Sequence, residues 1–126
     1  MSSYEIVPVD GFAQTTVEGE LDFESTAALL QGIAEASAAQ GRHLLIDLRD
    51  TEASELSYTD VYRLVGMLSR HPLAFRNRIA LLDTYREGFE KVQFFEVSAT
   101  DHGFEVRAFL DETAAVGWLE ATEPVA

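Results

Sequence analysis

Residues 44–64 read LLIDLRDTEASELSYTDVYRL, and this stretch decides the fold. It starts within an apolar run at 43–48, which has the composition of a strand covered on both faces of a sheet. After an acidic, hydroxyl-rich loop, Ser57 is followed three residues later by Asp60, a pattern similar to the capping box at the start of helices. Apolar positions then recur at helical spacing, at Val61, Tyr62, Val65 and Leu68. A buried strand followed by an amphipathic helix indicates an α/β fold.

Elements of the same kinds extend outward from this stretch in both directions. We expect strands at 4–9, 12–21, 43–48, 78–83 and 104–109, and helices at 22–40, 57–71, 85–99 and after Asp111. Asp22 and Asp111 are suitable N-caps, and Pro8 is typical of an edge strand. The order ββαβαβαβα predicts one domain over residues 1–126, with a mixed, mostly parallel sheet of about five strands covered by four helices.

The composition excludes several classes of function. A net charge of −13 would repel a phosphate backbone, so we expect no nucleic-acid partner. No apolar run approaches the roughly 18 residues that span a bilayer, and no signal peptide is visible at the start. We therefore expect a cytoplasmic location and no stable membrane insertion. The absence of cysteine excludes disulfides, thiolate metal sites and cysteine nucleophiles.

Motifs for catalysis, metals and cofactors are missing from the sequence. His43, His71 and His102 fall in separate elements without metal-ligand spacing. No GxSxG elbow, GxGxxG loop or P-loop is present. We therefore expect no catalytic residue, no metal site, no cofactor and no enzymatic activity.

Two helices carry more apolar residues than one narrow face needs. In the helix at 85–99, Phe89, Val92 and Phe95 follow one stripe, and Phe94 lies off it. In the helix at 57–71, Met67 widens the apolar face. Such faces enclose a pocket, expose a patch for a protein partner or a second subunit, or simply bury each other. The candidate residues for binding a small apolar ligand are Tyr58, Tyr62, Met67, Phe89 and Phe94.

The arginines in the second half of the chain allow two interpretations. Arg63 and Arg70 are seven residues apart and share one helical face, and further arginines follow at 76, 78 and 86. They form a patch for an anion or a partner, or they pair with surrounding carboxylates. We favour the pairing interpretation, in which each exposed pair adds little stability.

Three passages resemble the STAS domain, the fold of bacterial anti-sigma factor antagonists. GELDF at 19–23 resembles the family's G-x-L-D passage from the second strand into the first helix. LLIDLRDTE at 44–52 resembles the strand before the regulatory loop, and FEVRAFLDETAAVGWLEA at 104–121 resembles the closing strand and helix of the SpoIIAA-like branch. The resemblance implies a SpoIIAA-like fold, a protein without enzymatic activity and a small lipophilic ligand.

The regulatory loop departs from the family pattern. In the antagonists, a serine in an Asp-Ser-Ser/Thr-Gly-Leu type motif at the helix N-terminus is phosphorylated by a partner kinase. Here SELSYTDV at 54–61 lacks the Asp-Ser pair and the glycine, and Ser57 is the positional equivalent, with Ser54 beside it. A plain N-cap role also accounts for Ser57. The first hypothesis is therefore a binding protein for a small apolar ligand. The alternative is a protein-interaction module, docking through 54–60 and phosphorylated near Ser57.

Overall fold

A single mixed sheet forms the centre of the molecule in the computed structural model, which describes residues 2–121. The strands are β1 (Ser2–Val9), β2 (Phe12–Glu20), β3 (His43–Glu52), β4 (Ile79–Leu82) and β5 (Val106–Phe109). They lie side by side in chain order, with β1 antiparallel to β2 and every later pair parallel. The predicted edge position of the strand that holds Pro8 is confirmed, because β1 pairs with β2 alone.

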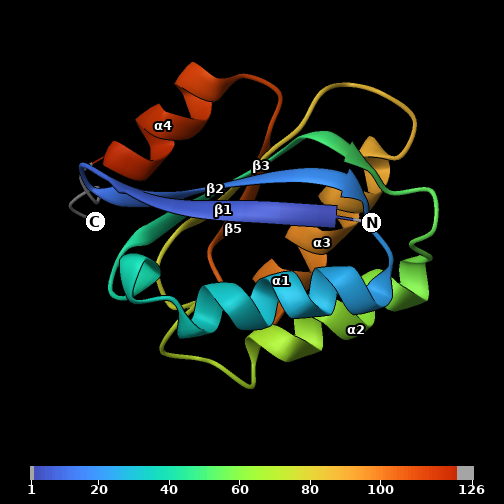
Figure 1. Cartoon of the computed structure of the whole chain (residues 1–126), viewed down its shortest axis with the longest axis horizontal. Coiled ribbons are helices and arrows are strands. Elements are labelled where there is room, and N and C mark those ends of the chain that lie inside the picture. The colour runs from blue at the N-terminus through green and yellow to red at the C-terminus, as the bar shows by residue number, and fades with distance from the viewer. Residues whose placement is uncertain (1, 122–126) are drawn as a thin grey trace.

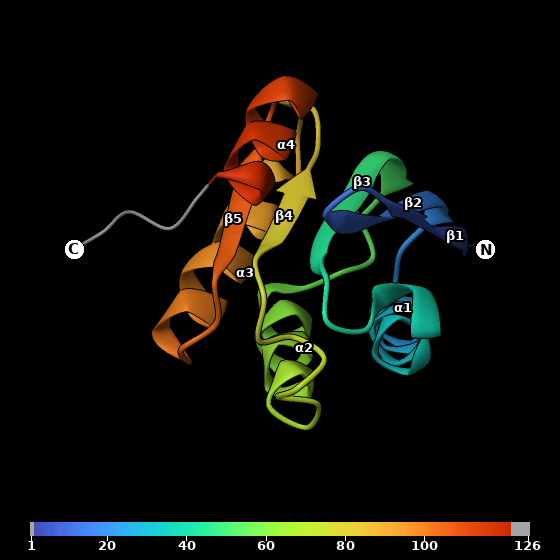
Figure 2. The same cartoon turned by 90° about the vertical axis from the view of Figure 1, so that its left-hand side faces the viewer.

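Helices cover the two faces of the sheet unequally. They are α1 (Phe23–Glu35), α2 (Tyr58–Leu68), α3 (Phe89–Asp101) and α4 (Glu112–Glu120), with a short 3₁₀ helix η1 (Ser37–Ala39). The first three lie on one face and α4 lies on the other (Figures 1 and 2). The reason is the strand order: right-handed crossovers that always advance in the same direction place their helices on the same face. None of these helices is long and apolar enough to cross a membrane, as far as residues 2–121 are concerned.

Two apolar cores result from this arrangement. The larger lies between the sheet and α1, α2 and α3, and the smaller lies under α4. Alternate residues of β3 serve both cores, since Leu44 and Ile46 belong to the larger and Leu45 to the smaller. Burial on both faces explains the apolar run that the sequence shows at 43–48.

The predicted helix starts are confirmed where a local cap sets them. The Ser57 hydroxyl accepts a hydrogen bond from the Asp60 N–H at 3.0 Å, and the Asp60 carboxylate accepts one from the Ser57 N–H at 3.2 Å. These reciprocal bonds form the predicted capping box of α2. Asp111 caps α4 with a single bond, its carboxylate accepting from the Ala114 N–H at 2.9 Å.

Three predicted boundaries are wrong by several residues. The helix predicted at 22–40 ends at Glu35, because Ala36 leaves the helical region and η1 carries the chain toward β3. The strand predicted at 43–48 continues to Glu52, because its far end still pairs with β2 after an irregularity in register. The helix predicted from residue 85 begins at Phe89, after a loop that ends at Gly88 with a φ of +100°.

Candidate functional site

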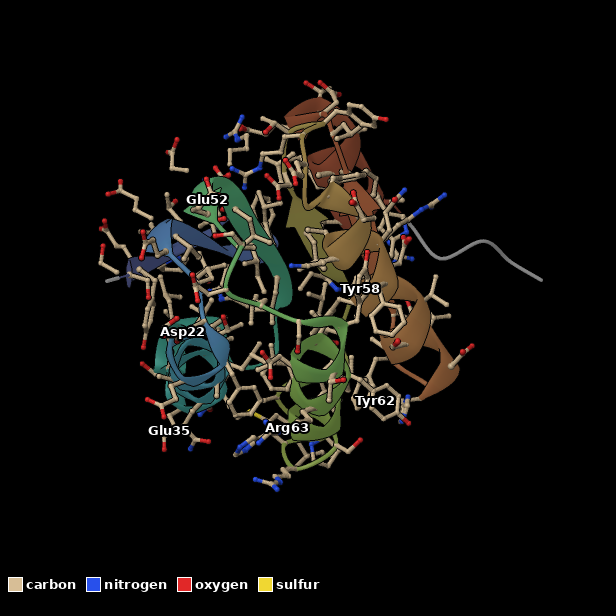
Figure 3. All side chains as sticks on the ribbon, turned by 90° about the vertical axis from the view of Figure 1, so that its right-hand side faces the viewer. Asp22, Glu35, Glu52, Tyr58, Tyr62 and Arg63 are labelled. Atoms are coloured by element: carbon tan, nitrogen blue, oxygen red, sulfur yellow. The ribbon has the colours of Figure 1, made fainter. Side chains whose placement is uncertain are left out.

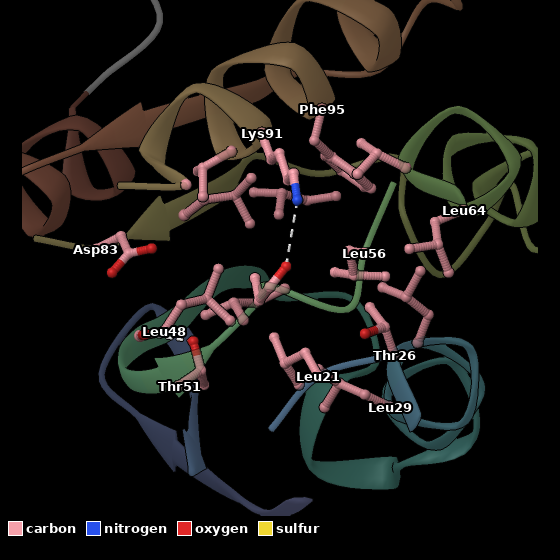
Figure 4. A pocket seen from close by; sticks show the side chains of 18 of the residues that line it. Leu21, Thr26, Leu29, Leu48, Thr51, Leu56, Leu64, Asp83, Lys91 and Phe95 are labelled. Atoms are coloured by element: carbon pink, nitrogen blue, oxygen red, sulfur yellow. Dashed lines mark hydrogen bonds between the residues drawn. The ribbon is translucent and has the colours of Figure 1, made fainter. Parts of the chain in front are cut away.

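A partly enclosed cavity of about 90 Å³ lies in the larger core, between the sheet and helices α1, α2 and α3 (Figure 4). Its walls come from β3 and β4, the loops that follow these strands, and the inner faces of the three helices. Leucine, isoleucine, valine and phenylalanine side chains make up most of the lining. In other proteins, an apolar cavity of about 150 Å³ stays dry and binds benzene, so a void of this kind suits an apolar guest.

Four polar side chains share the lining with these apolar groups: Thr26, Thr51, Asp83 and Lys91. The two threonine hydroxyls donate to nearby backbone carbonyls, each at 2.7 Å. Asp83 accepts from the Thr84 N–H at 2.8 Å and pairs with Arg86 at 3.0 Å. Lys91 reaches across from α3 toward the β3–α2 loop, where its Nζ lies 3.4 Å from the Ala53 carbonyl oxygen (Figure 4).

Two buried aspartates lie near the carboxyl end of β4, Asp47 in the middle of β3 and Asp83 directly after β4. Asp47 is in β3 opposite Leu82, and Asp83 follows β4 directly, so the parallel strands bring them to the same edge of the sheet. Burial acts to raise the pKa of Asp47, but hydrogen bonds from Arg49 outweigh it and hold this pKa below its ordinary value. Burial raises the pKa of Asp83, and the nearby Arg86 only partly offsets this rise.

Arg86 links the two sides of this edge. Its guanidinium donates to the backbone carbonyls of Leu48 and Thr51 in β3 and pairs with Asp83 from the β4–α3 loop. One side chain therefore attaches the loop before α3 to the end of β3. Asp83 and Arg86 are thereby fixed at the sheet before α3 begins at Phe89.

The five residues predicted to bind an apolar ligand do not share one site. None of them is among the residues that line the cavity. Tyr58 and Phe94 form an edge-to-face ring contact at 5.3 Å, and Tyr62 lies 5.8 Å from the ring of His102. Phe89 is buried. The role of these residues in ligand binding stays a prediction.

Met67 occupies a different groove, between α1 and α2. Phe23 and Arg63 line this groove with it, and the Arg63 guanidinium lies 4.0 Å from the centre of the Phe23 ring. Arg63 points from α2 toward α1, whereas Tyr58 and Tyr62 point toward α3 (Figure 3). The apolar residues of α2 thus face two separate neighbours.

Sequence reasoning missed most of the cavity wall. Val92 and Phe95 belong to the apolar stripe of the helix predicted at 85–99, and their side chains line the cavity. This apolar stripe was the local feature of the sequence that could have indicated part of the cavity wall. Lys91 and the loop residues Ala53 and Leu56 carried no local pattern that separates them from ordinary surface and loop positions.

The structure agrees with the favoured interpretation for three of the five arginines. Arg63, Arg78 and Arg86 have carboxylate partners at 3.7, 3.6 and 3.0 Å respectively. Within the described part of the chain, no group of three histidine, aspartate or glutamate side chains could hold a metal ion.

Both serines considered for phosphorylation are exposed. Ser57 is the N-cap of α2, and Ser54 lies in the loop between β3 and α2. Ser57 lies beside Tyr58, which is 47% exposed, and Tyr62, one turn after Tyr58, is 54% exposed. Hydroxyl and aromatic groups therefore share an accessible surface at the start of α2.

Comparison with solved structures identifies the fold of this chain. No protein-family model matches the chain, and no curated protein sequence matches it. An anti-sigma factor antagonist from Mycobacterium paratuberculosis is similar in structure, with a TM-score of 0.68 and 17% identity over 96% of each chain. A protein with a SpoIIAA-like fold from Shewanella loihica PV-4 matches with a TM-score of 0.55 and 18% identity, over 94% of this chain and 93% of that one. This chain has the SpoIIAA-like fold.

The SpoIIAA-like fold confirms the predicted class and the predicted order of elements. The resemblance of the three sequence passages to a STAS domain is confirmed at the same level, that of the fold. In this SpoIIAA-like chain, the cavity and the exposed start of α2 are separate features. The cavity lies within the larger core, whereas Ser57 and Tyr58 are exposed on the surface.

Proposed function

We propose that this protein binds a small apolar ligand in the cavity between the sheet and helices α1, α2 and α3, without transforming it. The observation that carries the proposal is the cavity itself. Protein interiors are close-packed, with few voids larger than a water molecule. Left unfilled, an apolar space of about 90 Å³ would cost about 2 kcal/mol of stability, at roughly 24 cal/mol per Å³. A ligand that fills it would recover that stability.

The lining supports an apolar guest. Contacts with leucine, valine and phenylalanine side chains would contribute about 25 cal/mol for each Å² of apolar surface that the ligand loses to water. The threonine hydroxyls and Asp83 already have protein partners, so they do not require a polar ligand. A mostly apolar lining with few convergent polar groups is typical of small-molecule sites.

The first test compares the mass of the protein, purified from cells, under native and denaturing conditions. We expect extra mass in the native spectrum that disappears on denaturation. Val92→Phe places a larger side chain in the cavity wall and should remove this extra mass. The matched control is Val97→Phe, on the same helix but 57% exposed, which should retain it. Equal retention in both variants would contradict binding in this cavity.

A second candidate function is a protein-interaction module of the antagonist type. The observation that favours it is the accessible group of Ser57, Tyr58 and Tyr62 at the start of α2, together with the fold that the chain shares with an anti-sigma factor antagonist. A helix N-terminus also tolerates a phosphate on Ser57, because its free N–H groups and dipole favour negative charge. A partner protein would then read the phosphorylation state.

The same mass spectra test this second candidate. A phosphate-sized increment that survives denaturation, and that Ser57→Ala removes while Ser54→Ala does not, would support it. If a captured partner bound the wild type and Ser57→Asp equally, phosphorylation at this serine would not control the interaction.

A further inference from the structure

The polar groups around the cavity differ in how much hydrogen-bonding capacity they have left. The Thr26 and Thr51 hydroxyls each donate a hydrogen bond to a backbone carbonyl at 2.7 Å. The Asp83 carboxylate accepts a hydrogen bond from a backbone N–H and pairs with a guanidinium. Arg86, just behind the wall, donates to two carbonyls and a carboxylate. These groups have their partners within the protein.

Lys91 is different. It is the only lysine of the chain, and it is the one cationic residue among the described residues that line the cavity. Its ammonium group has three donors, and within residues 2–121 the structure gives it a single long contact, 3.4 Å to the Ala53 carbonyl. The side chain is half-buried, so part of its hydration is already lost. A half-buried charge of this kind is stabilised by an opposite charge close by.

We infer that the ligand of this cavity carries a carboxylate at one end, held by Lys91, with its apolar part extending into the core. The inference rests on the proposed function and adds the chemical class of the ligand. A carboxylate can replace the weak carbonyl contact with a charge-assisted hydrogen bond, which is shorter and stronger. The remaining lining accepts only an apolar tail.

Charge around the cavity also orients the ligand. The Asp83 carboxylate occupies another part of the wall and opposes a second anion there. Glu52, Glu55 and Glu90 are exposed near the loop and the start of α3, and they act against small anions in general. An anion therefore binds only when its tail contributes apolar burial, so acetate should bind far more weakly than hexanoate.

Calorimetric titration with hexanoate and hexanol tests this inference. Wild type should bind both. Lys91→Met keeps the apolar stem and removes the charge, so it should weaken hexanoate binding by about tenfold or more and leave hexanol binding unchanged. Lys91→Arg should restore most of the affinity for hexanoate. Arg76→Met removes one exposed positive charge outside the cavity lining, and it should leave both affinities as in wild type.

The outcomes separate the inference from the function on which it rests. If Lys91→Met binds hexanoate as tightly as wild type, or loses hexanol binding equally, the role assigned to Lys91 is wrong while the cavity remains a ligand site. If wild type binds hexanol but not hexanoate, the inference that the ligand carries a carboxylate is wrong. If wild type binds neither compound, the proposed function and the inference fail together.

Discussion

At the scale of single residues, the carboxyl-terminal edge of the sheet depends on how two buried aspartates are paired. Asp47 and Asp83 are 7% and 3% exposed, and they lie in the middle of β3 and directly after the neighbouring strand β4. Each has an arginine partner, Arg49 for the first and Arg86 for the second. Removing one partner of a buried pair is more costly than the pair itself is stabilising, because the remaining charge is left without compensation.

Asp47 should make the stability of the protein depend on pH in the acid range. Burial alone would raise its pKa, but the hydrogen bonds from Arg49 prevail and lower it below the ordinary value of 3.8. A lowered pKa stabilises the folded state above the unfolded pKa, and this contribution is lost as pH falls through the folded value. We expect Asp47→Asn to reduce the free energy of unfolding by about 1–2 kcal/mol at neutral pH.

The difference between Asp47→Asn and wild type should narrow as pH falls below 3.8. Urea denaturation at a series of pH values measures it. Asp50→Asn is the control, since Asp50 is exposed on the same strand, and its effect should stay near zero throughout. A difference that stays constant with pH would mean that the Asp47–Arg49 pair is not responsible.

At the scale of elements, backbone conformation decides where α3 begins. Gly88 precedes the helix with a φ of +100°, a region that residues with a side chain rarely adopt. A Cβ atom at this position would meet no heavy atom within 4 Å, so any cost of substitution comes from the backbone alone. Gly88 thus connects the loop held by Arg86 to the helix that carries Lys91.

Two glycine substitutions should therefore have opposite effects. Gly88→Ala should lower the free energy of unfolding by about 1–2 kcal/mol, because alanine is strained at positive φ. Gly66→Ala, inside α2 and also with open space around its Cβ position, should raise it by about 0.5–1 kcal/mol through helix propensity. Chemical denaturation of both variants measures these changes, and a stabilising Gly88→Ala would refute the strained cap.

At the scale of the whole molecule, the two cores are of unequal size. The larger core joins the sheet to three helices, and the smaller core under α4 contains only a few buried residues, including Ala115 and Leu119. Local stability follows the amount of buried apolar contact. The face that holds α4 is therefore the weaker side of the molecule.

Hydrogen exchange should reveal this asymmetry. We expect the amides of α4 to exchange through a local opening of lower free energy than those of β3, which both cores bury. Addition of a cavity ligand should slow exchange in α1, α2 and α3 more than in α4, because α4 contributes no residue to the cavity lining. Uniform protection of α4 and β3 would mean that the two cores unfold as one unit.

The sequence by itself determined the features that depend on neighbouring residues. The order of strands and helices, the caps at Ser57 and Asp111, and the doubly buried strand at 43–48 all follow from local pattern. These signals are reliable because a cap or a periodic apolar face acts over one or two turns of chain. They were enough to predict the α/β class and the order of elements.

Only the tertiary structure decided the cavity and the groups around it. The contacts of Arg86 with β3 and of Lys91 with the β3–α2 loop join residues 35 to 38 positions apart, and neither has a local signature. The same holds for the late start of α3 and for the extension of β3. Whether an apolar residue fills a core or lines a void depends on the shapes of its distant neighbours, because packing is set by all three helices and the sheet together.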